Sequence, residues 1–85
     1  MNRLRELKAK AHNLKPVVRI GKNGLTATII KEIDTHLKKR KLIKIKILKS
    51  ALEKQDKKGI LNEILDKTKA EMVQMVGFTI SIHKK

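Results

Sequence analysis

The sequence of 85 residues predicts a single α/β domain over residues 1–85, with two layers and the element order α-β-α-β-α-β-β. Three segments repeat apolar residues at helical spacing. Four shorter segments are rich in β-branched residues or alternate apolar with polar residues. A strand, a helix and a second strand in succession favour a parallel pair, and a final hairpin adds an antiparallel pair. The sheet is therefore expected to be mixed and four-stranded.

The first half of the chain is expected to contain two helices and one short strand. An apolar stripe that begins at Leu4 predicts a helix over residues 3–13. The β-branched run after a proline predicts a strand over residues 17–20. Beyond a glycine-containing loop, Thr26 can cap a helix over residues 27–40. This second helix would form the crossover between two parallel strands.

Residues 42–48 show the clearest strand pattern in the chain. Isoleucine alternates with lysine, so the isoleucines point to one face while Lys44 and Lys46 point to the other. A face that carries two lysines is expected to be uncovered. Helices are therefore expected to back the sheet on one side only.

The last part of the chain is expected to form a helix and a hairpin. Apolar residues at helical spacing predict a helix over residues 57–68, and Asp56 is its expected N-cap. Residues 72–76 and 78–82 read as two strands. Gly77 between them permits a tight turn, which favours a hairpin.

The net charge of +14 arises from 22 lysine and arginine residues against 8 aspartate and glutamate residues. The excess is uneven, because residues 1–52 contain 15 basic and 3 acidic residues, whereas residues 53–85 contain 7 and 5. A polyanionic partner would relieve the self-repulsion of such a chain. High solubility is the alternative explanation, but it does not account for the asymmetry.

Several classes of protein are disfavoured by what the sequence lacks. It has no cysteine, which excludes disulfides and thiolate metal sites. Its three histidines fall on different expected elements, and no nucleophile, base and acid occur together. We therefore expect no enzyme activity, cofactor, metal or small-molecule substrate. The charged N-terminus and the lack of ~20 consecutive apolar residues predict a cytoplasmic protein without a membrane segment.

The segment Gly21-Lys22-Asn23-Gly24 bears most directly on function. It lies where the first strand is expected to lead into the second helix, so unpaired N–H groups and the positive helix dipole would meet there. Glycines let a phosphate–sugar backbone approach closely, and Lys22 adds a charge. Asn23 can adopt a left-handed conformation or donate a hydrogen bond. An ordinary strand-to-helix turn is the alternative interpretation.

Other polar side chains could extend this site. Lys44 and Lys46 would present ammonium groups on the uncovered face of the sheet, where a purely solvated surface is the alternative. The remaining candidates lie close to the loop in the sequence and are His12, Lys15, Arg19 and Thr26.

A resemblance to a known family is carried by the residues around this loop. The run from His12 to Thr26, HNLKPVVRIGKNGLT, resembles the signature of the CRM domain, which is named for chloroplast RNA splicing and ribosome maturation. Residues 31–34, 42–46 and 71–77 match later blocks of the same pattern. The resemblance therefore covers almost the whole chain.

This resemblance implies a stand-alone, YhbY-like RNA-binding domain, similar in fold to the C-terminal domain of translation initiation factor three. It implies that the loop from Gly21 to Gly24 contacts RNA. Bacterial members are linked to precursors of the large ribosomal subunit, so ribosomal RNA or a pre-ribosomal particle is the implied partner. Two positions depart from the pattern: Lys69 stands where the family often has glycine, and Ile82-His83 stands where it usually has tyrosine.

Alternatives to a ribosomal target remain at this stage. Another structured RNA, such as an intron or a tRNA, would suit the same residues. An electrostatic membrane-surface binder using residues 3–14 is a different class, which the lack of Trp and Phe anchors in that segment disfavours. Because Phe78 is the only aromatic residue, we expect phosphate contacts and RNA shape to outweigh base stacking. A monomer is the favoured oligomeric state.

Overall fold

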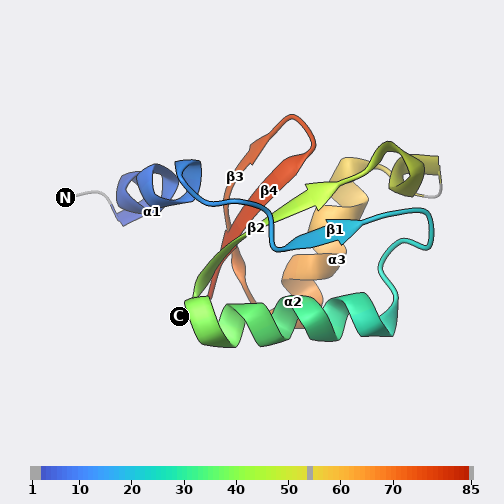
Figure 1. The fold of residues 1–85 in the computed structure, drawn as a ribbon, viewed down its shortest axis with the longest axis horizontal. Coiled ribbons are helices and arrows are strands. Elements are labelled where there is room, and N and C mark those ends of the chain that lie inside the picture. Colours follow the sequence, from blue (N-terminus) through green and yellow to red (C-terminus); the bar gives the residue numbers. More distant parts are fainter. Residues whose placement is uncertain (1–2, 54, 85) are drawn as a thin grey trace.

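Three α-helices, a short 3-10 helix and four strands make up residues 3–53 and 55–84, which the computed structural model describes (Figure 1). In chain order they are α1 (Arg3–His12), β1 (Val18–Ile20), α2 (Ala27–Arg40), β2 (Leu42–Ile47), the 3-10 helix η1 (Lys49–Glu53), α3 (Lys57–Thr68), β3 (Glu71–Val76) and β4 (Thr79–His83). The predicted order α-β-α-β-α-β-β is confirmed, and η1 occupies part of the connection between β2 and α3.

The predicted bounds are correct for α2 and α3 and shift by one residue elsewhere. Phe78 is the most informative difference, because it lies in the turn between β3 and β4 instead of beginning the last strand. The ammonium of Lys57 lies 5.0 Å from the centre of the Phe78 ring and donates a hydrogen bond of 3.0 Å to the Gly77 carbonyl. Gly77 has φ of +58°, so the predicted tight turn forms and is tied to the start of α3.

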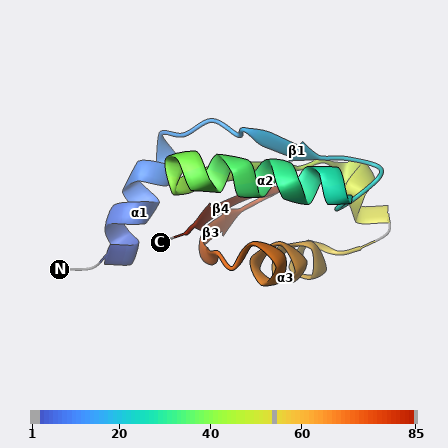
Figure 2. The same ribbon diagram turned by 90° about the horizontal axis from the view of Figure 1, so that it is seen from below.

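The strand order in the sheet is β1-β2-β4-β3. β1 runs parallel to β2, while β4 is antiparallel to both β2 and β3, so the predicted mixed sheet is confirmed. In this register Ile45 of β2 lies between Val18 and Ile80, which places the isoleucines of three strands on one face. Helices α2 and α3 cover that face, as Figure 2 shows from below.

The main core fills the space between this face and the two helices. It excludes water from an almost entirely aliphatic set of side chains, which supplies the largest stabilising contribution to the fold. Its buried members are Val18, Ile20, Ile33, Leu37, Ile43, Ile45, Ile47, Ala51, Ile60, Leu61, Ile64, Ile80 and Ile82.

The opposite face of the sheet is covered at one end by α1. Leu7 and Ala11 of α1 pack on Leu42 and Val73, forming a second apolar cluster separate from the main core. Val73 reaches this cluster because β3 has a register irregularity between Met72 and Gln74. The expectation that helices back the sheet on one side only is therefore wrong at this end, and it holds for α2 and α3.

Two helices begin at the side chains predicted to cap them. The hydroxyl of Thr26 accepts a hydrogen bond of 3.2 Å from the backbone N–H of Ile29, at the start of α2. The carboxylate of Asp56 accepts one of 2.8 Å from the N–H of Gly59, at the start of α3. Both caps satisfy donors that would otherwise lack a partner.

Lys69 ends α3 in a left-handed conformation with φ of 60°, and its N–H donates to the Leu65 carbonyl at 2.9 Å. This is the position where the resembling family often has glycine, and the geometry gives the reason. A left-handed residue at a helix C-terminus is usually glycine, because a Cβ crowds the neighbouring carbonyl. Lysine is therefore strained at this position.

We expect Lys69→Gly to raise the free energy of unfolding by about 0.5–1 kcal/mol, because glycine adopts this φ without the Cβ clash. Urea denaturation followed by circular dichroism measures the change. Lys69→Ala is the matched control, since it removes the same charge but keeps a Cβ, and it should give no gain. Equal stability of the two variants would contradict this explanation of the strain.

Candidate nucleic-acid interface

The glycine loop connects β1 to α2 through a single hydrogen-bonded turn. The Gly24 N–H donates to the Gly21 carbonyl at 2.9 Å, and the Thr26 N–H donates to the Gly24 carbonyl at 3.1 Å. Gly24 takes the left-handed conformation of this turn, with φ of +68°. The suggestion that Asn23 is left-handed is wrong, because its φ is not positive. The residue that requires glycine for its backbone conformation is therefore Gly24.

Several N–H groups around this turn have no hydrogen-bond partner within residues 3–53 and 55–84. They point to a helix start, where the macrodipole of α2 contributes partial positive charge. A hollow of about 250 Å³ lies against the turn and includes Gly21, Lys22, Thr26 and Thr28 in its lining. The unpaired N–H groups are those of Lys22, Asn23, Leu25, Ala27 and Thr28.

The loop glycines leave open backbone on the outer side of the turn. A Cβ added at Gly24 would meet nothing within 4 Å. One added at Gly21 would meet Leu48 Cδ1 at 3.6 Å and Ser50 Oγ at 3.9 Å, which are ordinary contacts. Folding therefore does not require a missing side chain at Gly21, and its bare backbone is available to an approaching ligand.

The strand register places three basic side chains on the face of the sheet that α2 and α3 do not cover. Arg19 of β1 pairs with Lys46 of β2, and the row continues through Thr79 to Val76. The next row on this face contains Lys44, Ser81 and Gln74. Neighbouring strands lie ~4.8 Å apart, so Arg19 and Lys46 are direct neighbours of like charge.

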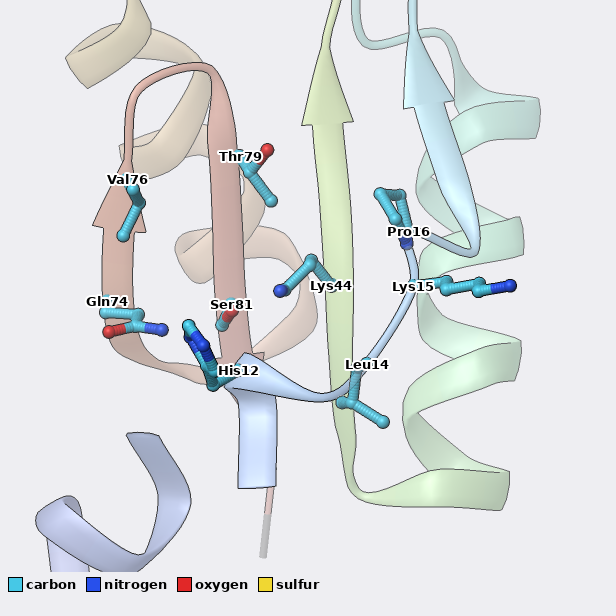
Figure 3. A pocket seen from close by; sticks show the side chains of 9 residues that line it. All are labelled: His12, Leu14, Lys15, Pro16, Lys44, Gln74, Val76, Thr79 and Ser81. Carbon is cyan, nitrogen blue, oxygen red and sulfur yellow. The ribbon is translucent and has the colours of Figure 1, made fainter. Parts of the chain in front are cut away.

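A hollow of about 350 Å³ lies in this open face, between the end of α1 and the β3–β4 hairpin. Figure 3 shows Lys44, Gln74 and Ser81 directed into the region that His12 borders, whereas the side chain of Lys15 points away from it. Ser81 is almost fully buried at its floor. The full lining consists of His12, Leu14, Lys15, Pro16, Lys44, Gln74, Val76, Thr79 and Ser81.

The structure brings most of the predicted residues into two adjoining groups. The loop group consists of Gly21, Lys22, Asn23, Gly24 and Thr26. The sheet-face group consists of Arg19, Lys44 and Lys46, with His12 at the edge of the hollow.

Lys15 is the exception, since it lies at the opposite end of β1 from the glycine loop.

Sequence reasoning missed three residues of the hollow. Thr79 and Ser81 alternate with buried isoleucines on β4, which would have placed them on the face opposite the core. Gln74 is the polar residue in an apolar strand. Their alternation was a usable signal, but only the pairing of β4 with β2 shows that they adjoin Lys44.

The acidic side chains pair with other cations, on the helices and at the α1 end of the sheet. Asp34 lies 3.1 Å from Lys38, a pair predicted from helical spacing, and 3.5 Å from Lys84. The hydrogen bond from Lys38 holds the pKa of the Asp34 carboxyl below its usual value, and Lys84 acts in the same direction. This carboxylate is therefore ionised at neutral pH and compensates part of the positive charge beside α2.

Glu63 and Glu71 show the same separation. Glu63 accepts a hydrogen bond of 2.9 Å from Lys67, which lowers the pKa of the Glu63 carboxyl. Glu71 bonds Arg3 at 2.8 Å, at the end of the sheet that α1 covers. By contrast, no ion pair in the described part of the chain involves four cations, which we call the cationic surface: Arg19, Lys22, Lys44 and Lys46.

Two searches of the described residues gave no further site. None of their helices is long and apolar enough to cross a membrane. No group of three or more histidine, aspartate or glutamate side chains among residues 3–53 and 55–84 is arranged to hold a metal ion.

A small mixed α/β domain that combines an uncompensated cationic sheet face with a glycine turn at a helix start has the features of a polyanion-binding module. The comparison with known families identifies it further. The CRS1 / YhbY (CRM) domain family matches residues 2–84, and the chain belongs to this family.

Curated relatives agree with this assignment. The chain is 45% identical over 80 residues to "Probable RNA-binding protein MJ0652" of Methanocaldococcus jannaschii, covering 94% of this chain and 59% of that protein. It is 38% identical over 78 residues to the "RNA-binding protein" of Haemophilus influenzae, covering 92% of this chain and 77% of that protein. The chain thus spans little more than half of the archaeal relative.

A solved structure supports the fold. The solution structure of the protein SAV1595 from Staphylococcus aureus superposes with a TM-score of 0.80 at 36% sequence identity. The match covers 96% of this chain and 83% of that protein.

The two loop glycines should differ in their effect on stability. We expect Gly24→Ala to lower the free energy of unfolding by about 1 kcal/mol, because alanine is strained at φ of +68°. We expect Gly21→Ala to change it by less than ~0.5 kcal/mol, because the added Cβ makes only ordinary contacts. Urea denaturation of both variants measures the difference, and a larger loss at Gly21 would contradict the geometry of the turn.

Proposed function

We propose that this chain is an RNA-binding protein that holds the RNA backbone on the Gly21–Gly24 loop and the cationic surface. The observation that carries the proposal is the set of four cations without an anionic partner on one side of the molecule, next to a turn with bare N–H groups. Relatives that are named RNA-binding proteins support RNA as the polyanion.

The two groups of residues suit different parts of a phosphate chain. At the loop, backbone N–H groups and the dipole of α2 favour a phosphate that approaches the bare glycines. On the sheet face, Arg19 and Lys46 repel each other in the free protein because they are adjacent. A phosphate placed between them would relieve that repulsion and release condensed counterions. Binding is therefore expected to weaken as salt increases.

Ribosomal RNA, or a precursor particle of the large ribosomal subunit, is the target we propose, with a role in ribosome assembly in the cytoplasm. The similarity of the loop and its flanking residues to the CRM signature supports this target. Another structured RNA, such as an intron or a tRNA, would present the same backbone and is the alternative. In either case the chain acts by binding, without a catalytic step.

The membrane-surface alternative has little support from the fold. An interfacial helix needs an apolar face that is free to enter the lipid. In α1 that face is occupied, because Leu7 and Ala11 pack against Leu42 and Val73 of the sheet. Only Leu4 remains as an exposed large apolar side chain on this helix.

Neutralising the cationic surface should weaken RNA binding more than an equal loss of charge elsewhere. We expect Arg19→Gln with Lys46→Gln to lower affinity for a labelled RNA hairpin roughly tenfold. We also expect the double variant to reduce the slope of log affinity against log salt by roughly 1.4, at ~0.7 for each phosphate contact on single-stranded RNA. Fluorescence anisotropy at several salt concentrations measures both quantities.

The control is Lys38→Gln with Lys67→Gln, which removes the same charge from the helical side. The exposed ion pairs lost there contribute little to stability, so this variant should fold and bind almost as the parent does. An equal loss of affinity in both double variants would show that only net charge matters.

The proposed target can be tested in cells. A tagged copy of the chain should migrate with precursors of the large ribosomal subunit on a sucrose gradient at low salt. Arg19→Gln with Lys46→Gln should shift it towards the top of the gradient, because phosphate contacts are lost. Recovery of the parent chain only in the free fractions would rule out the assembly role and leave general RNA binding.

A further inference from the structure

The hollow in the open face of the sheet differs chemically from the glycine loop. Its floor and sides carry side-chain groups that form directional hydrogen bonds: the ammonium of Lys44, the amide of Gln74 and the hydroxyl of Ser81. Apolar surface from Pro16 and Val76 lies beside them. A few convergent polar groups set among apolar surface characterise sites that recognise a small, partly apolar group.

The hollow also lies beside the proposed path of the RNA backbone. Lys44, Ser81 and Gln74 form the row next to Arg19 and Lys46 on the same face. Rows on one face of a sheet are two residues apart, or ~7 Å. A nucleotide whose phosphate lies at Arg19 and Lys46 could therefore place its base in the hollow.

We propose that this hollow binds a single unstacked base of the RNA held on the cationic surface, and that it prefers a keto base, uracil or guanine. The proposal rests on the proposed function, and it adds a sequence preference to binding of the backbone. The volume of about 350 Å³ is at the lower end of the ~300–1,000 Å³ of small-molecule sites, which suits one base better than a larger ligand.

The preference for a keto base follows from the donors that face the hollow. The ammonium of Lys44 can only donate, so it matches a carbonyl oxygen of uracil or guanine and opposes the amino group of cytosine or adenine. The face has no carboxylate that could accept from an amino group. Glu71, the acidic residue of the four strands, lies at the α1 end and bonds Arg3.

Base recognition here does not need the aromatic platform that the sequence lacks. Phe78 lies in the hairpin turn under the ammonium of Lys57 and is not part of the hollow. His12 is the one side chain of the lining with a flat ring, and RNA-binding proteins use histidine to stack on bases. Hydrogen bonds from Lys44, Gln74 and Ser81 would supply the selectivity.

The test compares three fluorescein-labelled oligomers of equal length: oligouridine, oligocytidine and an abasic ribose-phosphate chain. All three present the same phosphates, and uracil differs from cytosine in carrying a carbonyl where cytosine has an amino group. We expect the full chain to bind oligouridine roughly tenfold more tightly than the other two. Gln74→Ala and Ser81→Ala should each bring the affinity for oligouridine close to that for oligocytidine.

Asn62→Ala is the matched control, because this exposed polar residue of α3 is outside the hollow, and it should keep the preference. Nitrogen-15 NMR spectra establish that each variant is folded and should show oligouridine shifting the amides of Gln74 and Ser81 more than oligocytidine does. Equal binding of all three oligomers would overturn the base site while leaving RNA binding intact. Failure of every oligomer and of an RNA hairpin to bind at low salt would overturn the proposed function, and the base site with it.

Discussion

The pairing of β2 with β1 on one side and with β4 on the other is the constraint on which the rest of the molecule depends. Because β2 alternates isoleucine and lysine, these two pairings orient both faces of the sheet at once. The isoleucines lie beside those of β1 and β4 and close the main core against α2 and α3. The same registers bring Lys46 beside Arg19 and Lys44 beside Ser81. A slip of one residue would expose the core and bury the charges.

The distribution of acidic residues then decides where positive charge remains available. Asp34 and Glu63 are on the helices, where each pairs with lysine through solvent-exposed contacts. Such pairs add little to stability, so their main effect is to compensate charge on the helical side. The sheet face has no comparable carboxylate beside Arg19 and Lys46. A surface of neighbouring like charges opposes folding slightly, and a polyanion would convert that repulsion into affinity.

Helix α1 gives the open face its shape. By packing Leu7 and Ala11 on Leu42 and Val73, it covers one end of the face and leaves the remainder open. Its last residue, His12, then borders the hollow whose floor includes Ser81. The irregularity in β3 is part of this arrangement, because it turns Val73 towards α1 while Gln74 still pairs with Ser81. A flat sheet face thus becomes a shaped surface with polar groups at its floor.

Local sequence determined the helices and strands, the caps at Thr26 and Asp56, and the glycine turn, because spacing and turn chemistry act over a few residues. The similarity to the CRM signature likewise depends on contiguous residues, and the family assignment agrees with it. Tertiary structure alone decided that α1 covers part of the second face, that Lys15 lies away from the loop, and that Gln74 and Ser81 join Lys44 in one hollow. The physical reason is that these contacts depend on strand register between segments more than 30 residues apart in the sequence, which no local periodicity specifies.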